Sequence, residues 1–334
     1  MQKVRLLLGG DIMLGRGVNS IIHQRGYQFP FEPISEFTNK ADLFFANLEC
    51  AISDHEISFS GTPKMFYFRA DSTTTHSLRY AGIDLLSLAN NHALDANYQG
   101  LLDTMKHLDS AGIQYTGAGK NREEAWKPVI IEVSNLKIGV LAFCNHQANF
   151  AATSQQPGIA YINFSDHTIE NMITSISDLH DKVDMTIVSI HWQPNFAPMI
   201  TQKYQNLAHK MITAGADIIW GHSPHHFQGI EWIDGHPVLY SCGDLLDDYL
   251  VDPDFRNDLQ LLFLIELSGS YILNIQAYPL KLSYAQTDFA SNEHDLRWIQ
   301  NHFIKSCEEL GTRVTNNVSF FELTNPALRK QNER

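Results

Sequence analysis

Cysteine is scarce in this sequence, and its distribution excludes a thiolate metal cluster. Only four cysteines occur among 334 residues, and none belongs to a Cys-x-x-Cys pair. Cys50, Cys144 and Cys242 each end an apolar, strand-like run, where a small buried thiol is the common explanation. Without a disulfide framework the chain fits a reduced, cytoplasmic compartment, whereas an anchored relative would be membrane-associated.

Basic clusters and long hydrophobic runs are also missing. The chain has 24 basic against 37 acidic side chains, a formal charge of -13, and no run rich in lysine and arginine. Nucleic acid is therefore an unsuitable partner. The apolar run in MQKVRLLLGGD is too short to span a membrane and lacks the cleavage region of a signal peptide. We expect a soluble chain with no membrane span.

The composition that is present supports a packed α/β protein. At 44% hydrophobic and 18% charged residues, the chain can bury a core. Strands are expected at 3–9, 42–47, 83–89, 128–133, 137–143, 184–190, 217–220, 229–233, 237–241, 259–267 and 271–281, and helices at 97–111, 166–181, 201–214 and 292–310. Alternation of the two types indicates a parallel sheet, and the strand-rich stretch 229–281 indicates added antiparallel strands. The stretches 50–70 and 145–165 are expected to be loops that could cover a site.

Five short segments place metal-binding side chains where strands are expected to end. They are LLLGGDIMLGR (6–16), FFANLEC (44–50), LSLANNHALD (86–95), VSIHW (188–192) and IIWGHSPHH (218–226). The carboxyl ends of strands in an open α/β sheet share one edge, where ligands bind. We therefore expect one domain with two stacked mixed sheets, in which these side chains converge: Asp11, Glu49, Asn91, His92, His191, His222 and His225. This mixture of carboxylate, amide and imidazole suits one or two divalent ions such as Zn, Mn or Fe.

Each motif taken alone has an ordinary structural explanation. Gly-Asp after a strand, as at Asp11, is common in turns. Asn47 and Glu49 share one face of an extended segment, as polar residues at a sheet edge also do. A histidine that ends a strand, such as His191, is often a satisfied rim residue, and the histidines could be structural only. Five such motifs at strand ends favour a shared site.

The segment NNHALD carries a sharper signal than the others. Asn90, Asn91 and His92 follow one another, and such polar side chains are costly to bury unless each is bound to a partner. Asp95, three residues further on, could orient the His92 imidazole or tune its pKa.

The segment GHSPHH carries three histidines within five residues. Pro224 stiffens the turn between His222 and His225, which favours two ligands held in a fixed relation. His226 is expected to point away from them.

These motifs, in this order, resemble a known family. The order GGDIMLGR, NLEC, ANNHALD, HW and GHSPH, closing with YSCGDLL at 240–246, resembles the CapA/PgsA capsule-synthesis family, which is associated with poly-γ-glutamate production. DTMKHLDSAGIQYTGAGKNREEAWKPVIIEV (103–133) resembles its central segment. The family is similar to the calcineurin-like metallophosphoesterases, which implies a four-layer α/β/β/α sandwich of two mixed sheets and a two-metal site. We expect residues 1–285 to form this domain and residues 286–334 to be a C-terminal extension packed on it.

The resemblance also implies roles for individual residues. The implied metal ligands are Asp11, Glu49 as the bridging carboxylate, Asn91, His191, His222 and His225. His92 resembles the histidine that protonates a leaving group, and Asp95 would support it as a catalytic residue. The residues expected to contact substrate are Arg16, Asn47, Asn90 and Trp192, although a solvated helix-cap arginine explains Arg16 equally well.

The chain departs from the family pattern in three places. Residues 11–13 read Asp-Ile-Met where the phosphoesterases have Asp-x-His, so one ligand of the first metal is missing, as is common in the CapA-like group. Residues 193–195 read Gln-Pro-Asn where Gly-x-Glu is usual, and Asp244 replaces the usual asparagine. The first departure weakens or reshapes that metal position, and the other two affect substrate choice more than fold.

Two functions fit these features. The first is a metal-dependent hydrolase, of phosphoesterase or amidase type, in which a metal-activated water attacks a phosphoester or a γ-glutamyl amide. The alternative is a non-catalytic polymer-binding or scaffold subunit of a capsule polymer synthase. The expected partners are a small-molecule or glutamyl-polymer substrate, and synthase subunits or a second copy of the chain. The His92 acid and the number of candidate ligands favour the hydrolase.

Overall fold

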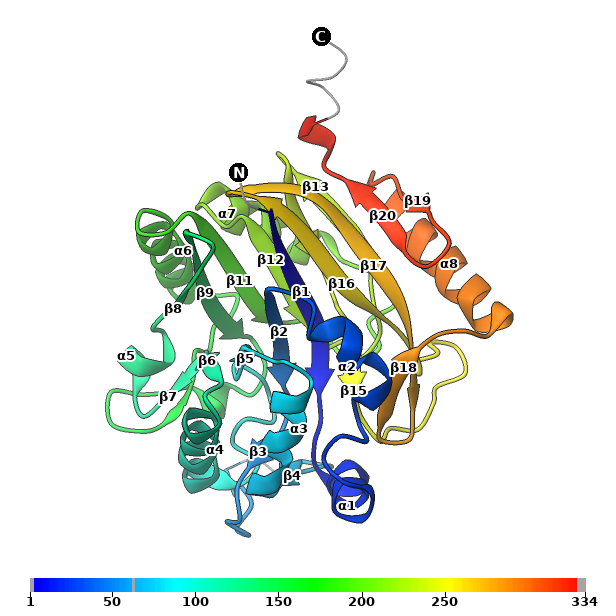
Figure 1. The fold of residues 1–334 in the computed structure, drawn as a ribbon. Helices are drawn as coiled ribbons and strands as arrows, with labels where there is room; N and C mark the ends of the chain where they lie inside the picture. The colour runs from blue at the N-terminus through cyan, green and yellow to red at the C-terminus, as the bar shows by residue number, and fades with distance from the viewer. Residues whose placement is uncertain (1–2, 62–63, 329–334) are drawn as a thin grey trace.

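Two mixed β-sheets form the centre of the protein (Figure 1). The computed structural model describes residues 3–61 and 64–328. The larger sheet has the order β19 (Thr315–Asn316), β20 (Phe321–Thr324), β17 (Tyr271–Ser283), β16 (Leu259–Ser268), β1 (Lys3–Ile12), β2 (Leu43–Leu48), β5 (Leu85–Ser87) and β6 (Gln114–Thr116). Two short strands join it, β15 (Asp244–Leu246) beside β1 and β18 (Gln286–Phe289) beside β17.

The second sheet has fewer strands and, like the first, combines parallel and antiparallel pairs. Its order is β13 (Ile230–Ile233), β14 (His236–Leu239), β12 (Ile218–His222), β11 (Met185–His191), β9 (Leu136–Cys144) and β8 (Val129–Val133). The strands β9, β11, β12 and β14 run parallel, as do β1, β2, β5 and β6 in the larger sheet, and antiparallel strands flank both groups. Small two-stranded pairs complete the strands: β3 (Ala51–Ile52) with β4 (Arg69–Ala70), and β7 (Ala118–Gly119) with β10 (Gly158–Ile159).

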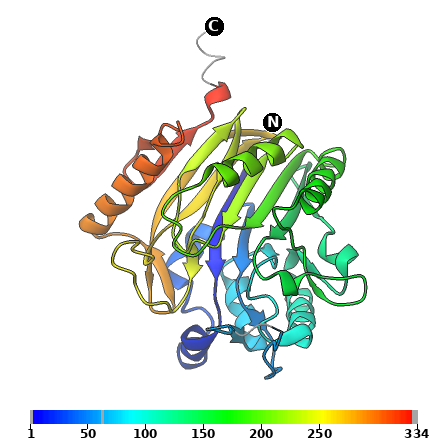
Figure 2. The same ribbon diagram turned by 180° about the vertical axis from the view of Figure 1, so that it is seen from behind.

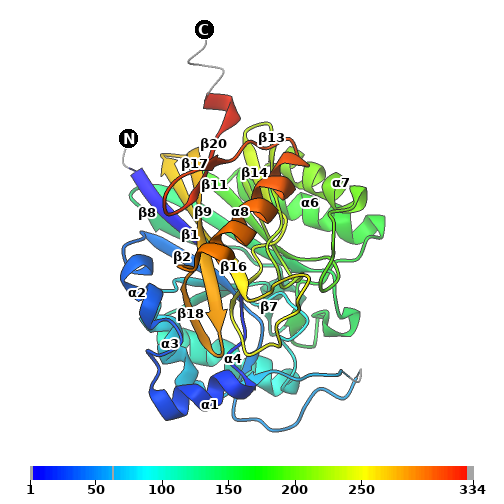
Figure 3. The ribbon, with the colours of Figure 1, turned by 90° about the vertical axis from the view of Figure 1, so that its right-hand side faces the viewer.

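Alternation along β1 shows how the sequence builds stacked layers. Leu6 and Leu8 pack between the two sheets, whereas Leu7 packs on the outer face of the larger sheet, because successive side chains of a strand point to opposite faces. Helices cover both outer faces (Figures 2 and 3). The outer face of the larger sheet carries α1 (Arg16–Arg25), α2 (Glu32–Thr38), α3 (Thr75–Tyr80) and α4 (Asn97–Ala111), and that of the smaller sheet carries α6 (Asp166–His180) and α7 (Gln202–Thr213). The predicted four-layer α/β/β/α sandwich is confirmed.

The C-terminal part joins this sandwich. Helix α8 (Glu293–Glu308) buries Ile299, Phe303 and Cys307 in the apolar cluster between the sheets, and β20 extends the larger sheet beyond β17. A short helix, α5 (Arg122–Ala125), and two single 3-10 turns, Ser72–Thr74 and Ala148–Phe150, lie between the longer elements. Within the described ranges, no helix combines the length and apolar character needed to cross a membrane.

The four helices expected from the sequence form as α4, α6, α7 and α8, but α1, α2 and α3 were not predicted. Helix α1 begins after Gly15 without a side-chain cap, and α2 has only seven residues and no side-chain cap, so neither sequence carries a strong helix signal. Both helices are stabilised by packing on the larger sheet.

Candidate metal centre

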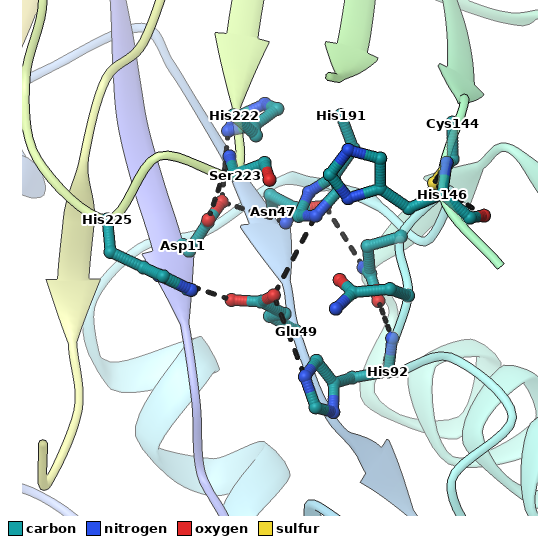
Figure 4. A network of polar contacts seen from close by, with 12 residues as sticks. Asp11, Asn47, Glu49, His92, Cys144, His146, His191, His222, Ser223 and His225 are labelled. Carbon is teal, nitrogen blue, oxygen red and sulfur yellow. Dashed lines mark hydrogen bonds and ion pairs between the residues drawn. The ribbon is translucent and has the colours of Figure 1, made fainter. Parts of the chain in front are cut away.

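The carboxyl ends of β1, β2, β11 and β12 meet at one edge of the sandwich. Parallel register places Asp11 beside Asn47 and His191 beside His222. The indole of Trp220 donates a hydrogen bond of 2.9 Å to the Gly9 carbonyl and so ties the smaller sheet to the larger one. The side chains that follow these strands, although more than two hundred residues apart in sequence, therefore face one another (Figure 4).

Glu49 lies at the centre of this group. Its side chain is 1% exposed, and neither carboxylate oxygen has a hydrogen-bond partner among the described residues. Oε1 lies 3.8 Å from His191 Nε2 and 4.0 Å from His92 Nε2, whereas Oε2 lies 3.9 Å from His225 Nδ1. The two oxygens thus face different histidines, at separations too long for direct hydrogen bonds. Burial, and then the nearby charge of Asp11, raise the pKa of Glu49 well above its ordinary value.

Asp11 accepts two hydrogen bonds and lies against one imidazole. Asn47 donates to Oδ1 over 2.9 Å, the backbone N–H of Ser223 donates to Oδ2 over 3.3 Å, and His222 Nδ1 lies 3.1 Å from Oδ1. Burial opposes the charge, but the contact with His222 and the neighbouring imidazoles lower the pKa of Asp11 to about 2. Asp11 is therefore an ionised carboxylate, the form that binds a cation.

Two further imidazoles face the group without hydrogen-bond partners among the described residues. Both ring nitrogens of His191 and of His222 are buried and unpaired, as is Oδ1 of Asn91. Burial lowers the pKa of His191 well below its ordinary value, so the ring is neutral and able to ligate a metal. Unpaired buried polar atoms are costly, and a shared cation would satisfy these three side chains.

Asp244 was not among the predicted site residues, but it belongs to this group. It follows Gly243 on β15, which pairs in parallel with β1 so that Asp244 lies beside Asp11. Its Oδ1 lies 2.9 Å from His225 Nδ1. Single ligand atoms from Asp11, Glu49, His225 and Asp244 all lie within 4.8 Å of one another, and all four residues are buried. Burial opposes protonation of His225, but Asp244 and Glu49 raise its pKa to about 10, and a bound metal would displace that proton.

The turn between His222 and His225 has an unusual backbone. Ser223 and His225 adopt φ values of 101° and 61°, in the left-handed region that L-residues rarely occupy. Contacts hold this turn, because the Ser223 hydroxyl donates to the Gln193 carbonyl over 2.9 Å while its N–H donates to Asp11. Such strain concentrates at functional sites. His226 lies outside the group, with its ring nitrogens near the carbonyls of Phe227 and Ala197.

His92 presents one ring nitrogen to the group and the other to Asp95. Nδ1 lies 2.5 Å from Asp95 Oδ2, while Nε2 faces Glu49. Phe68 stacks on the imidazole with the ring centroids 4.1 Å apart. Lys64, which the sequence did not indicate, reaches in from the segment between β3 and β4, with Nζ 2.6 Å from Asp95 Oδ1 and 3.1 Å from His92 Nδ1. Burial lowers the pKa of His92 to about 4, although Asp95 opposes this, so the ring is neutral at neutral pH.

The residues predicted to contact substrate lie in different places. Asn90 donates to the Leu48 carbonyl over 2.7 Å and to Asn47 over 3.2 Å, and it accepts from the His92 N–H over 3.0 Å. Asn47 and Asn90 are fully buried, so they orient Asp11 and His92 within the structure.

Trp192 and Arg16 occupy opposite environments. Trp192 is fully buried among the residues between the smaller sheet and its helices, and it donates to the Tyr240 carbonyl, so substrate contact is not supported for it. Alternation along β11 explains this, because Trp192 follows His191 and points to the other face. Arg16 has a side chain that is 40% exposed, 3.4 Å from Asp248 and over the ring of Phe66.

The chain is similar in sequence to several known proteins. The family model described as "Bacterial capsule synthesis protein PGA_cap" matches residues 5–249. A "Probable polyglutamine synthesis accessory protein" of Mycobacterium tuberculosis is 30% identical over an alignment that covers 93% of each chain. The "Capsule biosynthesis protein CapA" of Bacillus anthracis is 28% identical over 74% of this chain and 60% of its own length. For the "PGA biosynthesis protein CapA" of Bacillus subtilis the identity is 28%, over 72% of this chain and 62% of its own length.

Proposed function

This chain belongs to the bacterial capsule synthesis family PGA_cap, as its motifs predicted, and we propose that it is a metal-dependent hydrolase of a phosphoester or γ-glutamyl amide bond. The proposal combines the family with the chemistry of the buried group around Glu49. It assigns that group to catalysis and does not limit it to holding the strands together.

The observation that carries the proposal is the pair of oxygens on Glu49. Both are buried without a hydrogen-bond partner in the described chain, and they lie 3.8 Å from His191 Nε2 and 3.9 Å from His225 Nδ1. Metal–nitrogen and metal–oxygen bonds of about 2.0–2.2 Å place two ligands of one ion at such separations. An unpaired buried carboxylate would otherwise be costly, so a shared cation explains an arrangement that hydrogen bonding does not.

The donor set fits borderline divalent ions. Asp11, Glu49 and Asn91 supply oxygen, and the three imidazoles of His191, His222 and His225 supply nitrogen, which together suit Zn, Mn or Fe. A divalent ion bound here would lower the pKa of a coordinated water to about 7 and polarise the oxygen of the bond under attack.

His92 is the proposed proton donor. Asp95 accepts from Nδ1 and fixes the ring, which leaves Nε2 directed at the group. At rest the ring is neutral, since its pKa is lowered to about 4. An anionic substrate beside Nε2 would raise that pKa and favour the protonated form that passes a proton to the leaving group.

An anionic substrate would need a positively charged side chain close to the site. The chain carries a formal charge of -13, so a negative substrate must be met by local positive groups. Arg16, partly exposed on the rim beside Phe66, is the proposed counterion. The names of the relatives refer to polyglutamine and capsule synthesis, which makes a glutamyl compound the first substrate class to test.

A second candidate function is a non-catalytic accessory subunit of a polymer synthase. The word "accessory" in the name of the mycobacterial relative favours it. In that case the metal group would bind the polymer or stiffen the subunit without turnover.

Metal analysis followed by a substrate screen tests the proposal. The wild-type protein should bind a divalent ion in stoichiometric amount and hydrolyse a member of a panel of phosphoesters and γ-glutamyl amides. Glu49→Gln, which keeps the side-chain shape and removes the charge, should lose most of both. A metal-bound wild type that turns over no member of the panel supports the accessory function, and a wild type that binds no ion contradicts the proposed site.

A further inference from the structure

Asp244 gives the two halves of the proposed metal centre different chemistry. We infer that Asp11, Glu49, Asp244 and His225 form an oxygen-rich position that binds a hard divalent cation such as Mn²⁺ in preference to Zn²⁺. This inference rests on the proposed function for the existence of a metal centre, and it adds a ligand and a metal preference that the sequence motifs did not indicate.

The fold brings Asp244 to this position by a close backbone contact. The N–H of Asp11 donates to the Gly243 carbonyl over 2.9 Å, and the strands pair so that Asp11 and Asp244 are neighbours. Gly10 allows this approach, because a Cβ at that position would lie 2.1 Å from the Gly243 oxygen. Two carboxylates from distant parts of the chain are thereby held side by side.

The four side chains form a set with the composition of a cation site. Three carboxylates and one imidazole offer atoms within 4.8 Å of one another, and none of the four residues is more than 6% exposed. Asp244 Oδ2 and both oxygens of Glu49 have no hydrogen-bond partner in the described part of the chain. Three buried carboxylates this close repel one another when they are ionised, and a divalent cation bound between them would offset that repulsion.

A purely structural role for Asp244 would be to orient His225. The contact of 2.9 Å between Asp244 Oδ1 and His225 Nδ1 allows this. However, the same Nδ1 atom also faces Glu49 Oε2 at 3.9 Å, so this edge of the ring points towards the carboxylate side chains of the set (Figure 4). An orienting carboxylate would instead hold the nitrogen that faces away from the metal.

The two halves of the centre therefore differ in ligand type. Glu49 Oε2 faces the set with Asp11, Asp244 and His225, three oxygens and one nitrogen. Glu49 Oε1 faces His191, which lies beside His222, and this half is richer in imidazole. Carboxylate oxygens suit Mg and Mn, whereas imidazole suits Zn, Cu and Fe. Asp244 adds a third carboxylate to the first half and shifts its ligand set towards oxygen.

The test compares metal uptake by the full chain with and without this carboxylate. Metal-stripped wild type, Asp244→Asn and the control Asp248→Asn are dialysed against equal Mn²⁺ and Zn²⁺ and assayed by mass spectrometry and Mn²⁺ electron paramagnetic resonance. We expect wild type and Asp248→Asn to retain both metals. Asp244→Asn should keep Zn²⁺ and bind Mn²⁺ about tenfold or more weakly. Circular dichroism of the stripped proteins checks folding, and Asp244→Glu, which restores the carboxylate, should recover Mn²⁺ if Asp244→Asn folds poorly.

The outcomes separate this inference from the proposed function. Equal Mn²⁺ binding by wild type and Asp244→Asn overturns the inference and leaves Asp244 as a hydrogen-bond acceptor for His225. Zn²⁺ in both positions of the wild type overturns the metal preference while the hydrolase proposal stands. A wild type that binds neither metal overturns both.

Discussion

The ammonium group of Lys64 lies 2.6 Å from Asp95 Oδ1, on the carboxylate whose other oxygen holds His92. The Asp95 side chain is fully buried and that of Lys64 is 10% exposed. A loop residue from between β3 and β4 is thereby fixed to the predicted catalytic pair. The backbone N–H of Phe68 also donates to Asp95 over 2.6 Å, so one carboxylate connects two residues of this loop to His92.

Removal of Lys64 is expected to destabilise the protein more than an ordinary surface change. Lys64→Met leaves Asp95 as a buried charge with one partner fewer, and breaking such a pair typically costs about 3 kcal/mol. The double variant with Asp95→Asn should cost less than the sum of the two single variants, because the unpaired charge is then gone. Urea unfolding of wild type and the three variants gives the coupling energy between Lys64 and Asp95. If the costs of the two single variants add up to the cost of the double variant, the pair contributes nothing beyond its separate contacts.

His222→Ala is expected to abolish stoichiometric metal binding. Both ring nitrogens of His222 are buried without hydrogen-bond partners in the described chain, and the ring lies beside Asp11. His226→Ala is the matched control, since this histidine belongs to the same turn but its ring nitrogens lie near backbone carbonyls. Metal content per chain, measured after dialysis, should fall for the first variant only. Full metal content in His222→Ala would reject its assignment as a ligand.

The sequence predicted much of this architecture because strand ends carry local signals. Apolar runs such as 137–143 and 184–190 are long and β-prone, and the polar side chains that follow them mark the edge where they meet. Alternation then explains why His191 faces the group while Trp192 does not, a distinction that the prediction for Trp192 overlooked.

Residues placed by long-range contact could not be predicted in the same way. Asp244 belongs to a three-residue strand that exists because it pairs with β1, more than two hundred residues earlier. The Gly-Asp after the apolar run ending at Cys242 repeats the pattern at Asp11, and this was the available signal. Lys64 lies in an irregular segment without periodicity, so only the folded chain reveals that it reaches Asp95.

Gly10→Ala is expected to destabilise the protein by about 3 kcal/mol and to weaken metal binding, because backbone cannot move aside as a side chain can. The added Cβ would lie 2.1 Å from the Gly243 carbonyl oxygen, where β1 and β15 meet. Gly9→Ala is the matched control. Its Cβ would meet the side chains of Leu245 and Phe44 at 2.9 and 3.2 Å, and we expect a cost of about 1 kcal/mol. Denaturant unfolding compares the two, and equal costs would show that the Gly10 contact is not critical.

The ion pairs around Asp258 predict a pH-dependent contribution to stability. Partial burial opposes its charge, but hydrogen bonds from Arg256 and Lys281 lower the pKa of Asp258 below its ordinary value of 3.8. Because the folded-state pKa is depressed, the contribution is fully present above about pH 4 and is lost as the pH falls through the folded-state pKa. The free energy of unfolding of wild type should therefore exceed that of Asp258→Asn at pH 6, and this difference should shrink as the pH falls below about 4. A difference that is constant over this range would contradict the assignment.

His92→Ala is expected to keep its fold and its metal but to lose most turnover. The ring directs Nε2 at the group, 4.0 Å from Glu49 Oε1, so it is placed to pass a proton to a leaving group bound there. Loss of a general acid typically costs about 10²–10⁴ in rate. Turnover on whichever phosphoester or γ-glutamyl amide the wild type accepts should fall by that factor, while metal content stays unchanged. His146→Ala is the control. The His146 ring is also largely buried, and its centroid lies 5.5 Å from that of His191, but no carboxylate in the described chain pairs with it as Asp95 pairs with His92. Loss of metal from His92→Ala would make it a ligand, and normal turnover would place the proton donor elsewhere.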